Sequence, residues 1–274
     1  MLSTLALSAG VTQGLILTGY FLLLVLGSYL LGNISFARIL ARTQKDDITT
    51  HGSGNPGTAN MLRTHGVSFG FLTMILDMLK GAIPCIVGFF AFGGFAGGMT
   101  AKIAIYVAGT SAVIGHIYPV FYKFKGGKGV ATAAGMACVA HPYIALILLV
   151  AYILLLIITR ISSLCSLVIA VTYITYDCIT LGLAGNWVSL GLLVFVLFLI
   201  VWGHRANIKR LLERKENVID LEAAVNKDVA RISKHKQERL EKKQQKQDQL
   251  QQKAQQNIQE NIDNVEQQND KKED

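Results

Sequence analysis

The sequence predicts an all-α integral membrane protein with seven transmembrane helices and a charged C-terminal tail. Apolar residues make up 51% of the 274 residues and charged residues 16%, whereas a soluble domain usually carries about a quarter charged residues. Residues 1–204 hold ten Lys and Arg against four Asp and Glu, so +6 of the net +8 lies in the apolar part. Residues 205–274 are highly charged and nearly balanced. We therefore expect a membrane domain over 1–204 and a cytoplasmic tail over 205–274.

The spans follow from hydrophobic length, because a transmembrane helix needs about 20 mostly apolar residues. A short candidate at 129–141 is rich in small residues, which let helices approach closely in lipid. Residues 1–13 hold no Lys or Arg, so a signal peptide's charged segment is missing and the first run is expected to stay as a helix. The other predicted spans are 13–37, 67–91, 100–121, 143–159, 163–183 and 187–203.

The basic connections favour seven spans over six. Lys and Arg fall in 38–66 and 122–128, at Arg160 and at the start of the tail, and the other connections hold none. Basic loops are expected in the cytoplasm. With seven spans and the N-terminus outside, every basic connection and the C-terminus lie there. With six spans, skipping 129–141, Arg160 changes sides and the tail goes outside.

The tail is expected to begin as an amphipathic helix. Leu211, Val218, Val225 and Ile232 recur every seven residues, a spacing typical of a helix that lies on a membrane or pairs with another helix. Beyond about Lys234 the chain is rich in Gln, Lys, Asp and Glu, which indicates an exposed helix or disorder.

The first basic connection contains HGSGNPGTANMLR at residues 51–63. Glycines let backbone N–H groups form an anion-binding concavity. Asn60 and Arg63 share one face if a helix begins near Thr58. An ordinary Gly/Pro turn would also explain the glycines. The candidate anion-binding residues here are Ser53, Gly54, Asn55, Gly57, Asn60 and Arg63.

The second basic connection runs GHIYPVFYKFKGGKGVAT over 115–132. Lys125 and Lys128 stand among Gly126, Gly127 and Gly129, and lysines with exposed N–H groups suit phosphate. A purely topological anchor would explain the lysines but not the glycines. His116, at the membrane boundary, is either a structural hydrogen-bonding residue or part of the site.

Further polar residues lie at the same side. Asp77 and Lys80, three residues apart in the second span, either form an ion pair that fixes the bundle or add Lys80 to the anion site. Few carboxylates oppose the cations, so their summed field suits an anion such as phosphate. No HExxH or CxxC motif occurs, so a reaction would rest on positioning and electrostatics. The remaining candidates are Arg160 and Ser162 at the third inward turn and His204 and Asn207 at the end of the last span, where simple inside anchors are the alternative.

Five segments carry a family resemblance: GSGNPGTANMLRTHG, LDMLKGAIP, GHIYPVFYKFKGGKGVATAAG, RISSL and HRANIKRLL. In this order and spacing, from about Gly27 to Glu216, the chain resembles the bacterial acyl-phosphate:glycerol-3-phosphate acyltransferase family. The resemblance implies a seven-helix enzyme of the bacterial inner membrane whose active site faces the cytoplasm. It would move a fatty acyl group from acyl phosphate, not acyl-CoA or acyl carrier protein, to sn-glycerol 3-phosphate. Lysophosphatidic acid and phosphate would form, as the first step of phospholipid synthesis, with no metal or cofactor.

The resemblance also implies roles for residues. Catalytic roles fall to Ser53, Arg63, Lys128, His204 and Asn207. The implied partners are acyl phosphate, glycerol 3-phosphate, the lipid bilayer and, functionally, the enzyme that makes acyl phosphate, with no nucleic acid. Thr58-Ala59 reverses the family's Ala-Thr order, and the tail after Glu216 exceeds the usual family length. The implied substrate-binding residues are Gly54, Asn55, Gly57, Asn60, His116, Lys125, Gly126, Gly127, Gly129, Arg160 and Ser162.

A direct displacement is the expected mechanism. The hydroxyl of glycerol 3-phosphate attacks the acyl carbonyl, and the departing phosphate takes its proton. Lys125 and Lys128 are expected at the donor phosphate, and Arg63 with His204 and Asn207 at the acceptor phosphate. The alternatives are a transporter of phosphate or a small organic anion, which should show mid-span charges and internal repeats, and a scaffold acting through its tail.

Overall fold

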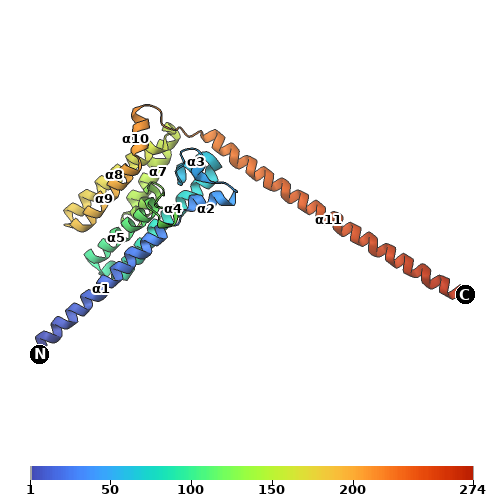
Figure 1. Cartoon of the computed structure of the whole chain (residues 1–274), viewed down its shortest axis with the longest axis horizontal. Coiled ribbons are helices and arrows are strands. Elements are labelled where there is room, and N and C mark those ends of the chain that lie inside the picture. Colours follow the sequence, from blue (N-terminus) through green and yellow to red (C-terminus); the bar gives the residue numbers. More distant parts are fainter. Residues whose placement is uncertain (1, 274) are drawn as a thin grey trace. The chain divides into compact units, whose positions relative to one another are not determined.

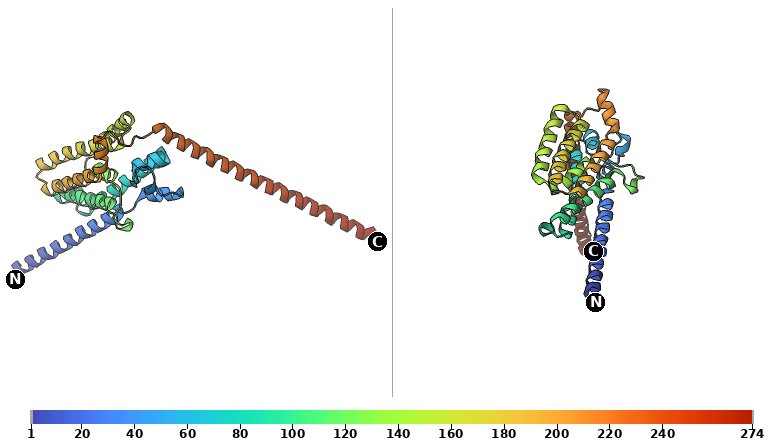
Figure 2. Two further views of the ribbon diagram at one scale, coloured as in Figure 1. Left: turned by 45° about the horizontal axis from the view of Figure 1, so that its top comes forward. Right: turned by 90° about the vertical axis from the view of Figure 1, so that its left-hand side faces the viewer.

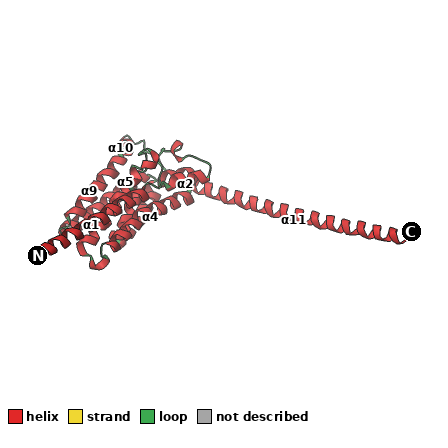
Figure 3. Cartoon of the chain, turned by 60° about the horizontal axis from the view of Figure 1, so that its bottom comes forward, coloured by secondary structure: helices red, strands yellow, loops and turns green. Residues whose placement is uncertain are grey.

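The computed structural model describes residues 2–273 and contains only helices and loops there (Figure 3). The prediction of an all-α protein is therefore confirmed for the described residues. The long helices are α1 (Leu2–Gly32), α4 (Val67–Ala91), α5 (Gly98–Ile117), α7 (Pro142–Thr159), α8 (Ser162–Leu183), α9 (Trp187–Gly203) and α11 (Leu221–Glu273). The short helices are α2 (Phe36–Thr43), α3 (Thr58–His65), α6 (Val130–Ala140) and α10 (Arg205–Leu212), with single 3-10 turns at Ile48–Thr50, Gly94–Ala96 and Val120–Tyr122.

Five segments among the described residues are long and apolar enough to cross a membrane. α9 and α10 make a sixth if the pair, bent by 57°, counts as one span. α6 has 11 residues, and about 16 Å of helix does not reach across a hydrocarbon core about 30 Å thick. Every predicted span is thus helical, but the count of seven full spans stays a prediction. The five segments are Thr12–Thr43, Val67–Ala91, Gly98–Tyr122, Pro142–Thr159 and Ser162–Leu183.

α6 and α7 form a hairpin whose corner lies within the bundle. The corner residue His141 places Nε2 2.9 Å from Asp177 Oδ1 of α8. After Asp177, α8 continues to its end at Leu183, so about 9 Å of this helix lies beyond the corner. α7 then returns, and at its end the carbonyl of Arg160 accepts a hydrogen bond from the Ile219 N–H at 2.8 Å. α6 therefore enters the bundle and α7 leaves it at the same end.

The basic connections gather at this end. Arg38 donates a hydrogen bond to the Lys125 carbonyl at 2.8 Å, and Lys128 Nζ lies 2.6 Å from Asn207 Oδ1. Figure 1 shows α3 and α10 at the same end of the bundle. At the other end of the bundle, the N-terminal part of α1 extends beyond the neighbouring helices (Figure 2). Side chains of α1 such as Leu15 are exposed there.

A buried ion pair fixes the break between α1 and α2. Lys80 is 1% exposed, and its Nζ lies 2.8 Å from Asp77 Oδ1 and 2.8 Å from the carbonyl oxygen of Ile34. Carbonyls at a helix end have no partner in the helix, so the ammonium satisfies one there. Of the two readings that the sequence left open for Lys80, these contacts favour the structural one.

The contacts divide the chain between Val225 and Asn226, later than the boundary expected at residue 204. The reason is that Ile219 is fully buried and packs with Leu62 and Ala224. The segment after α10 therefore belongs to the membrane unit. The second unit, from Asn226, is the remaining length of α11.

Glycines allow α4 and α6 to touch backbone to backbone. A Cβ at Gly81 would overlap the carbonyl of Thr132, and a Cβ at Gly135 would overlap the carbonyl of Met78. Small residues are what permits such approach in membrane bundles. This contact positions α6, and with it the Lys128 connection that precedes it.

We expect Gly135→Val to destabilise the membrane unit, because the added carbons must push α6 away from α4. The predicted cost is about 1–3 kcal/mol, the usual range for overpacking, seen as a lower unfolding temperature of the detergent-purified protein. Gly191→Ala is the matched control, since a Cβ there meets nothing within 4 Å. Equal unfolding temperatures for both variants would contradict the packing argument.

Candidate functional site

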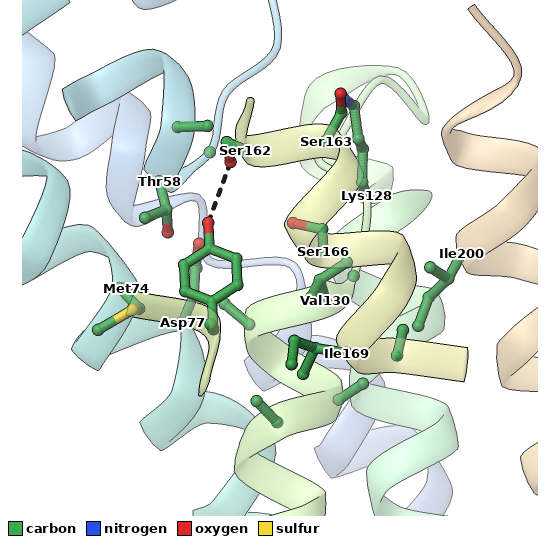
Figure 4. Close-up of a pocket in the computed structure, with 18 of the residues that line it drawn as sticks. Thr58, Met74, Asp77, Lys128, Val130, Ser162, Ser163, Ser166, Ile169 and Ile200 are labelled. Carbon is green, nitrogen blue, oxygen red and sulfur yellow. Dashed lines mark hydrogen bonds between the residues drawn. The ribbon is translucent and has the colours of Figure 1, made fainter. Parts of the chain in front are cut away.

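Residues from α3, α4, α6, α7, α8 and α9 line a cavity that we call the amphiphilic cavity. Figure 4 shows Lys128, Ser162 and Ser163 at one end and Val130, Ile169 and Ile200 further in. Its interior is thus mainly apolar, with Asp77, His116 and Ser166 also in the lining, and its mouth is polar. The polar mouth comprises Ser53, Arg63, Lys128, Ser162, Ser163, His204, Asn207, Glu216 and Asn217.

A second cavity, which we call the cationic cavity, adjoins it. Its lining holds five Lys and Arg side chains and no carboxylate. Arg38, Arg205 and Arg210 were not among the predicted site residues, because in the sequence they count only as topology anchors. Both cavities share Ser53, Asn55, Lys128 and Asn207. The cationic lining consists of Arg38, Lys125, Lys128, Arg205 and Arg210.

A hydrogen-bonded chain runs along the shared wall. Lys128 Nζ donates to Asn207 Oδ1 at 2.6 Å, and Asn207 Nδ2 donates to Glu216 Oε1 at 2.8 Å. Arg210 Nε donates to Glu216 Oε2 at 3.0 Å. This hydrogen-bonded chain therefore holds one carboxylate among its cations. No sequence motif indicates a role for Glu216, which ends a charged stretch of mixed sign, ERKE at residues 213–216.

Burial lowers the pKa of Lys128, the lysine of this hydrogen-bonded chain. The pKa of Lys128 is lowered to about 8, mainly by desolvation; Arg210 and Arg63 contribute to the lowering and Glu216 opposes it. Burial likewise lowers the pKa of Arg63, which stays charged at neutral pH. Lys128 thus carries its charge at neutral pH but lies close to losing it.

Asn60 holds the first loop in shape. Its Oδ1 accepts the Ser53 N–H at 2.9 Å, and its Nδ2 donates to the carbonyls of Ile48 and His51 at 3.0 Å each. The side chain is 1% exposed and lines neither cavity. This placement differs from the predicted direct contact with phosphate, because the amide is used up within the loop.

The start of α3 faces the amphiphilic cavity. Gly57, Thr58 and Ala59 line it, and Figure 4 shows Thr58 at the cavity. The first N–H groups of a helix have no carbonyl partner within it and carry the positive end of its dipole. The reversed Thr58-Ala59 order thus keeps a hydroxyl at the cavity.

The glycines of the second loop serve packing. The Gly126 and Gly127 N–H groups donate to the carbonyls of Ile117 and His116 at 3.1 Å each, and a Cβ at Gly127 would overlap the His116 ring. These amides are therefore not open to a ligand, unlike the prediction. Gly126 lines the cationic cavity, while His116 and Gly129 line the amphiphilic one.

The last candidates separate into two groups. Arg160 lines neither cavity, like Asn60 and Gly127. Ser162 lines the amphiphilic cavity, with Oγ 3.0 Å from Tyr152 Oη. His204 is buried with Nδ1 2.8 Å from the Ile200 carbonyl oxygen, so Nδ1 carries the proton and Nε2 is the acceptor of the neutral ring. Ser53, Arg63, Lys128, His204 and Asn207 all meet at the amphiphilic cavity.

Comparisons with known proteins point to one family. Residues 22–214 match the family model "Glycerol-3-phosphate acyltransferase". The glycerol-3-phosphate acyltransferases of Halalkalibacterium halodurans and Myxococcus xanthus are 39% and 40% identical to the chain, covering 71% and 70% of it and 93% and 96% of those proteins. A crystal structure of PlsY, an integral membrane glycerol 3-phosphate acyltransferase in its glycerol 3-phosphate form, has a TM-score of 0.66 and 34% identity, covering 75% of this chain and 98% of that one. A second PlsY structure, in a lysophosphatidic acid form, has a TM-score of 0.64.

We expect anion binding at the shared wall to weaken as the pH rises through about 8, because the folded protein holds the pKa of Lys128 there. Below that pH the ammonium is present, and above it the amine is neutral. Bound anion favours the charged form, so the measured midpoint should lie somewhat higher. Sulfate is the probe, since its charge is constant over this range, and its affinity is read from thermal stabilisation. In Lys128→Arg the weakening near pH 8 should disappear, and the same pH profile in that variant would contradict the assignment.

Proposed function

Because the chain belongs to the glycerol-3-phosphate acyltransferase family, we propose that it transfers a fatty acyl group from acyl phosphate to sn-glycerol 3-phosphate. The products are 1-acyl-sn-glycerol 3-phosphate, which is lysophosphatidic acid, and inorganic phosphate. The chain is an acyltransferase and a membrane protein by family. The donor, the product and the roles of individual residues are the proposal.

One observation carries this proposal: two unlike cavities meet at a common wall. The amphiphilic cavity offers an apolar interior to an acyl chain and a polar mouth to the group attached to it. The cationic cavity offers positive charge without an apolar interior, which suits a small hydrophilic phosphate ester. An acyl phosphate and glycerol 3-phosphate match these two requirements.

We propose a placement of the two phosphates that differs from the one expected from the sequence. Lys125 lines only the cationic cavity, whereas Arg63 and His204 line only the amphiphilic one. Since the acyl chain needs the apolar interior, we place the donor phosphate near Arg63 and His204 and the acceptor phosphate near Lys125. Lys128 and Asn207, in the shared wall, lie between the two.

The proposed step is a single acyl transfer. The primary hydroxyl oxygen of glycerol 3-phosphate bonds to the acyl carbon, and the bond from that carbon to the phosphate oxygen breaks. Phosphate leaves with the bonding electrons and accepts the hydroxyl proton. The nearby carboxylate of Glu216 accepts hydrogen bonds from Asn207 and Arg210, which favours the leaving phosphate as the base. Lys128 stabilises the negative charge that develops on the leaving phosphate.

The proposed location follows from charge. The basic connections meet at one end of the bundle, and basic loops lie in the cytoplasm. We therefore propose a bacterial inner-membrane enzyme whose site faces the cytoplasm. There it would receive acyl phosphate from the enzyme that makes it.

The direct test is purified protein with palmitoyl phosphate and labelled glycerol 3-phosphate, with palmitoyl-CoA run alongside. We expect a labelled lyso-lipid from the acyl phosphate only. Product from palmitoyl-CoA alone would overturn the donor. No product from either donor would favour a transporter of phosphate or an organic anion.

In the same assay we expect Ser53→Ala and Lys128→Ala to lower kcat/KM by roughly 100- to 1000-fold, the range for losing one preorganised electrostatic contact. Lys123→Ala is the matched control, because Lys123 belongs to the same loop and lines neither cavity. Wild-type rates in the Ser53 and Lys128 variants, with all proteins inserted equally, would remove both residues from the site.

We expect truncation after Val225 to leave turnover unchanged, because every residue lining the two cavities precedes it. The measurement is the lyso-lipid assay on the truncated and the full chain. Loss of activity in a stably folded truncated protein would favour a function that depends on the tail.

A further inference from the structure

The amphiphilic cavity has a defined inner end. On α8 the lining residues run from Ser162 to Ile174, and along α9 they run from its C-cap residue His204 back to Leu193. These stretches correspond to about 18 and 16 Å of helix. Cys138 of α6 and Ala145 of α7 are the innermost lining residues of those helices. The cavity therefore stops at one level across four helices.

A polar cluster lies directly beyond this level. Asp177, one helical turn after Tyr173, is fully buried. It accepts hydrogen bonds from Tyr173 Oη at 3.0 Å and from Tyr106 Oη at 2.9 Å, and His141 Nε2 lies 2.9 Å away. An ionisable group inside a membrane domain is costly and marks function by default. The proposed acyl transfer does not use it.

The cluster holds the ring that ends the cavity. Tyr173 is buried, lines the innermost part of the cavity and is tied at its hydroxyl to Asp177. If the ring moved aside, the buried carboxylate of Asp177 would lose one of its hydrogen-bond donors. Leaving a buried acceptor without a partner is unfavourable. Behind it, the corner between α6 and α7 closes the space, since His141 contacts both Asp177 and the Tyr173 ring.

From this geometry we propose that Tyr173, positioned by Asp177 and His141, is the end stop for the acyl chain and sets the longest chain that the enzyme uses efficiently. The inference rests on the proposed function, because it takes the amphiphilic cavity as the acyl site. A chain that reaches the ring must either fold back or displace a hydrogen-bonded tyrosine. Shorter chains leave the cluster untouched.

The test measures kcat/KM for glycerol 3-phosphate acylation with lauroyl, myristoyl, palmitoyl and stearoyl phosphate. The readout is the stearoyl-to-lauroyl ratio of kcat/KM for each enzyme. Tyr173→Ala removes the ring at the inner end of the cavity, so longer chains should fit. The ratio should rise on the order of tenfold over wild type, the size of effect that one methylene contact in an apolar pocket produces. Ala145→Leu adds volume at the same level from α7 and should lower the ratio by a similar factor.

Two controls separate the ring from other effects. Tyr173→Phe keeps the ring volume but loses the hydrogen bond to Asp177, so its ratio should rise above that of wild type by less than in Tyr173→Ala. Tyr143→Ala removes a tyrosine that is 83% exposed and lines neither cavity, so its ratio should be unchanged.

The outcomes distinguish the two proposals. A wild-type protein that is inactive with every acyl phosphate contradicts the proposed function. An active wild type whose ratio is kept by both Tyr173→Ala and Ala145→Leu overturns the end stop. If Tyr173→Ala does not yield folded protein, Ala145→Leu decides alone: a lowered ratio supports the end stop and a wild-type ratio refutes it.

Discussion

The shortness of α6 is the constraint on which the rest of the site depends. Eleven residues cannot cross a bilayer, and unpaired backbone groups are not tolerated in lipid. Both ends of α6 must therefore be satisfied by protein. At its start the chain turns through Gly129 at a positive φ of 84° and presents Lys128. At its end His141 reaches Asp177. The close contact with α4 through Gly81 and Gly135 fixes both ends at once.

The charged residues near α6 give the site a net positive charge that one carboxylate partly offsets. Lys128, Arg63 and Arg210 repel one another, and this repulsion adds to the desolvation that lowers the pKa of Lys128. Glu216 offsets part of it through Asn207 and Arg210. Because the hydrogen-bonded chain holds these groups in place, little reorganisation is needed when an anion enters. A bound phosphate would balance the positive charge that the single carboxylate of Glu216 leaves unbalanced.

The sequence predicts what depends on local pattern and misses what depends on contacts across the chain. Hydrophobic length and basic connections predicted the helices, and the site residues Ser53, Lys128 and His204 meet as a group. The role of Asn60 was not predictable, because its partners lie in a loop whose shape the sequence does not specify. Glu216 was missed for the same reason: only the fold brings it to Asn207. The sequence pattern predicts phosphate binding at the glycines of 126–127, but their close packing on α5 is a tertiary feature that the pattern does not show.

The two cavities also explain how one site can handle a lipid and a water-soluble substrate. In the proposed reaction the acyl chain stays in the amphiphilic cavity while its carbonyl carbon changes partner at the shared wall. The product then occupies both cavities, with its chain among α6, α8 and α9 and its phosphate among the cations. Inorganic phosphate is the only part that loses its covalent link, so it can leave without the chain moving. A shared lysine next to both phosphates is what such a transfer needs, and a single undivided cavity would not keep the acceptor hydroxyl and the acyl chain apart.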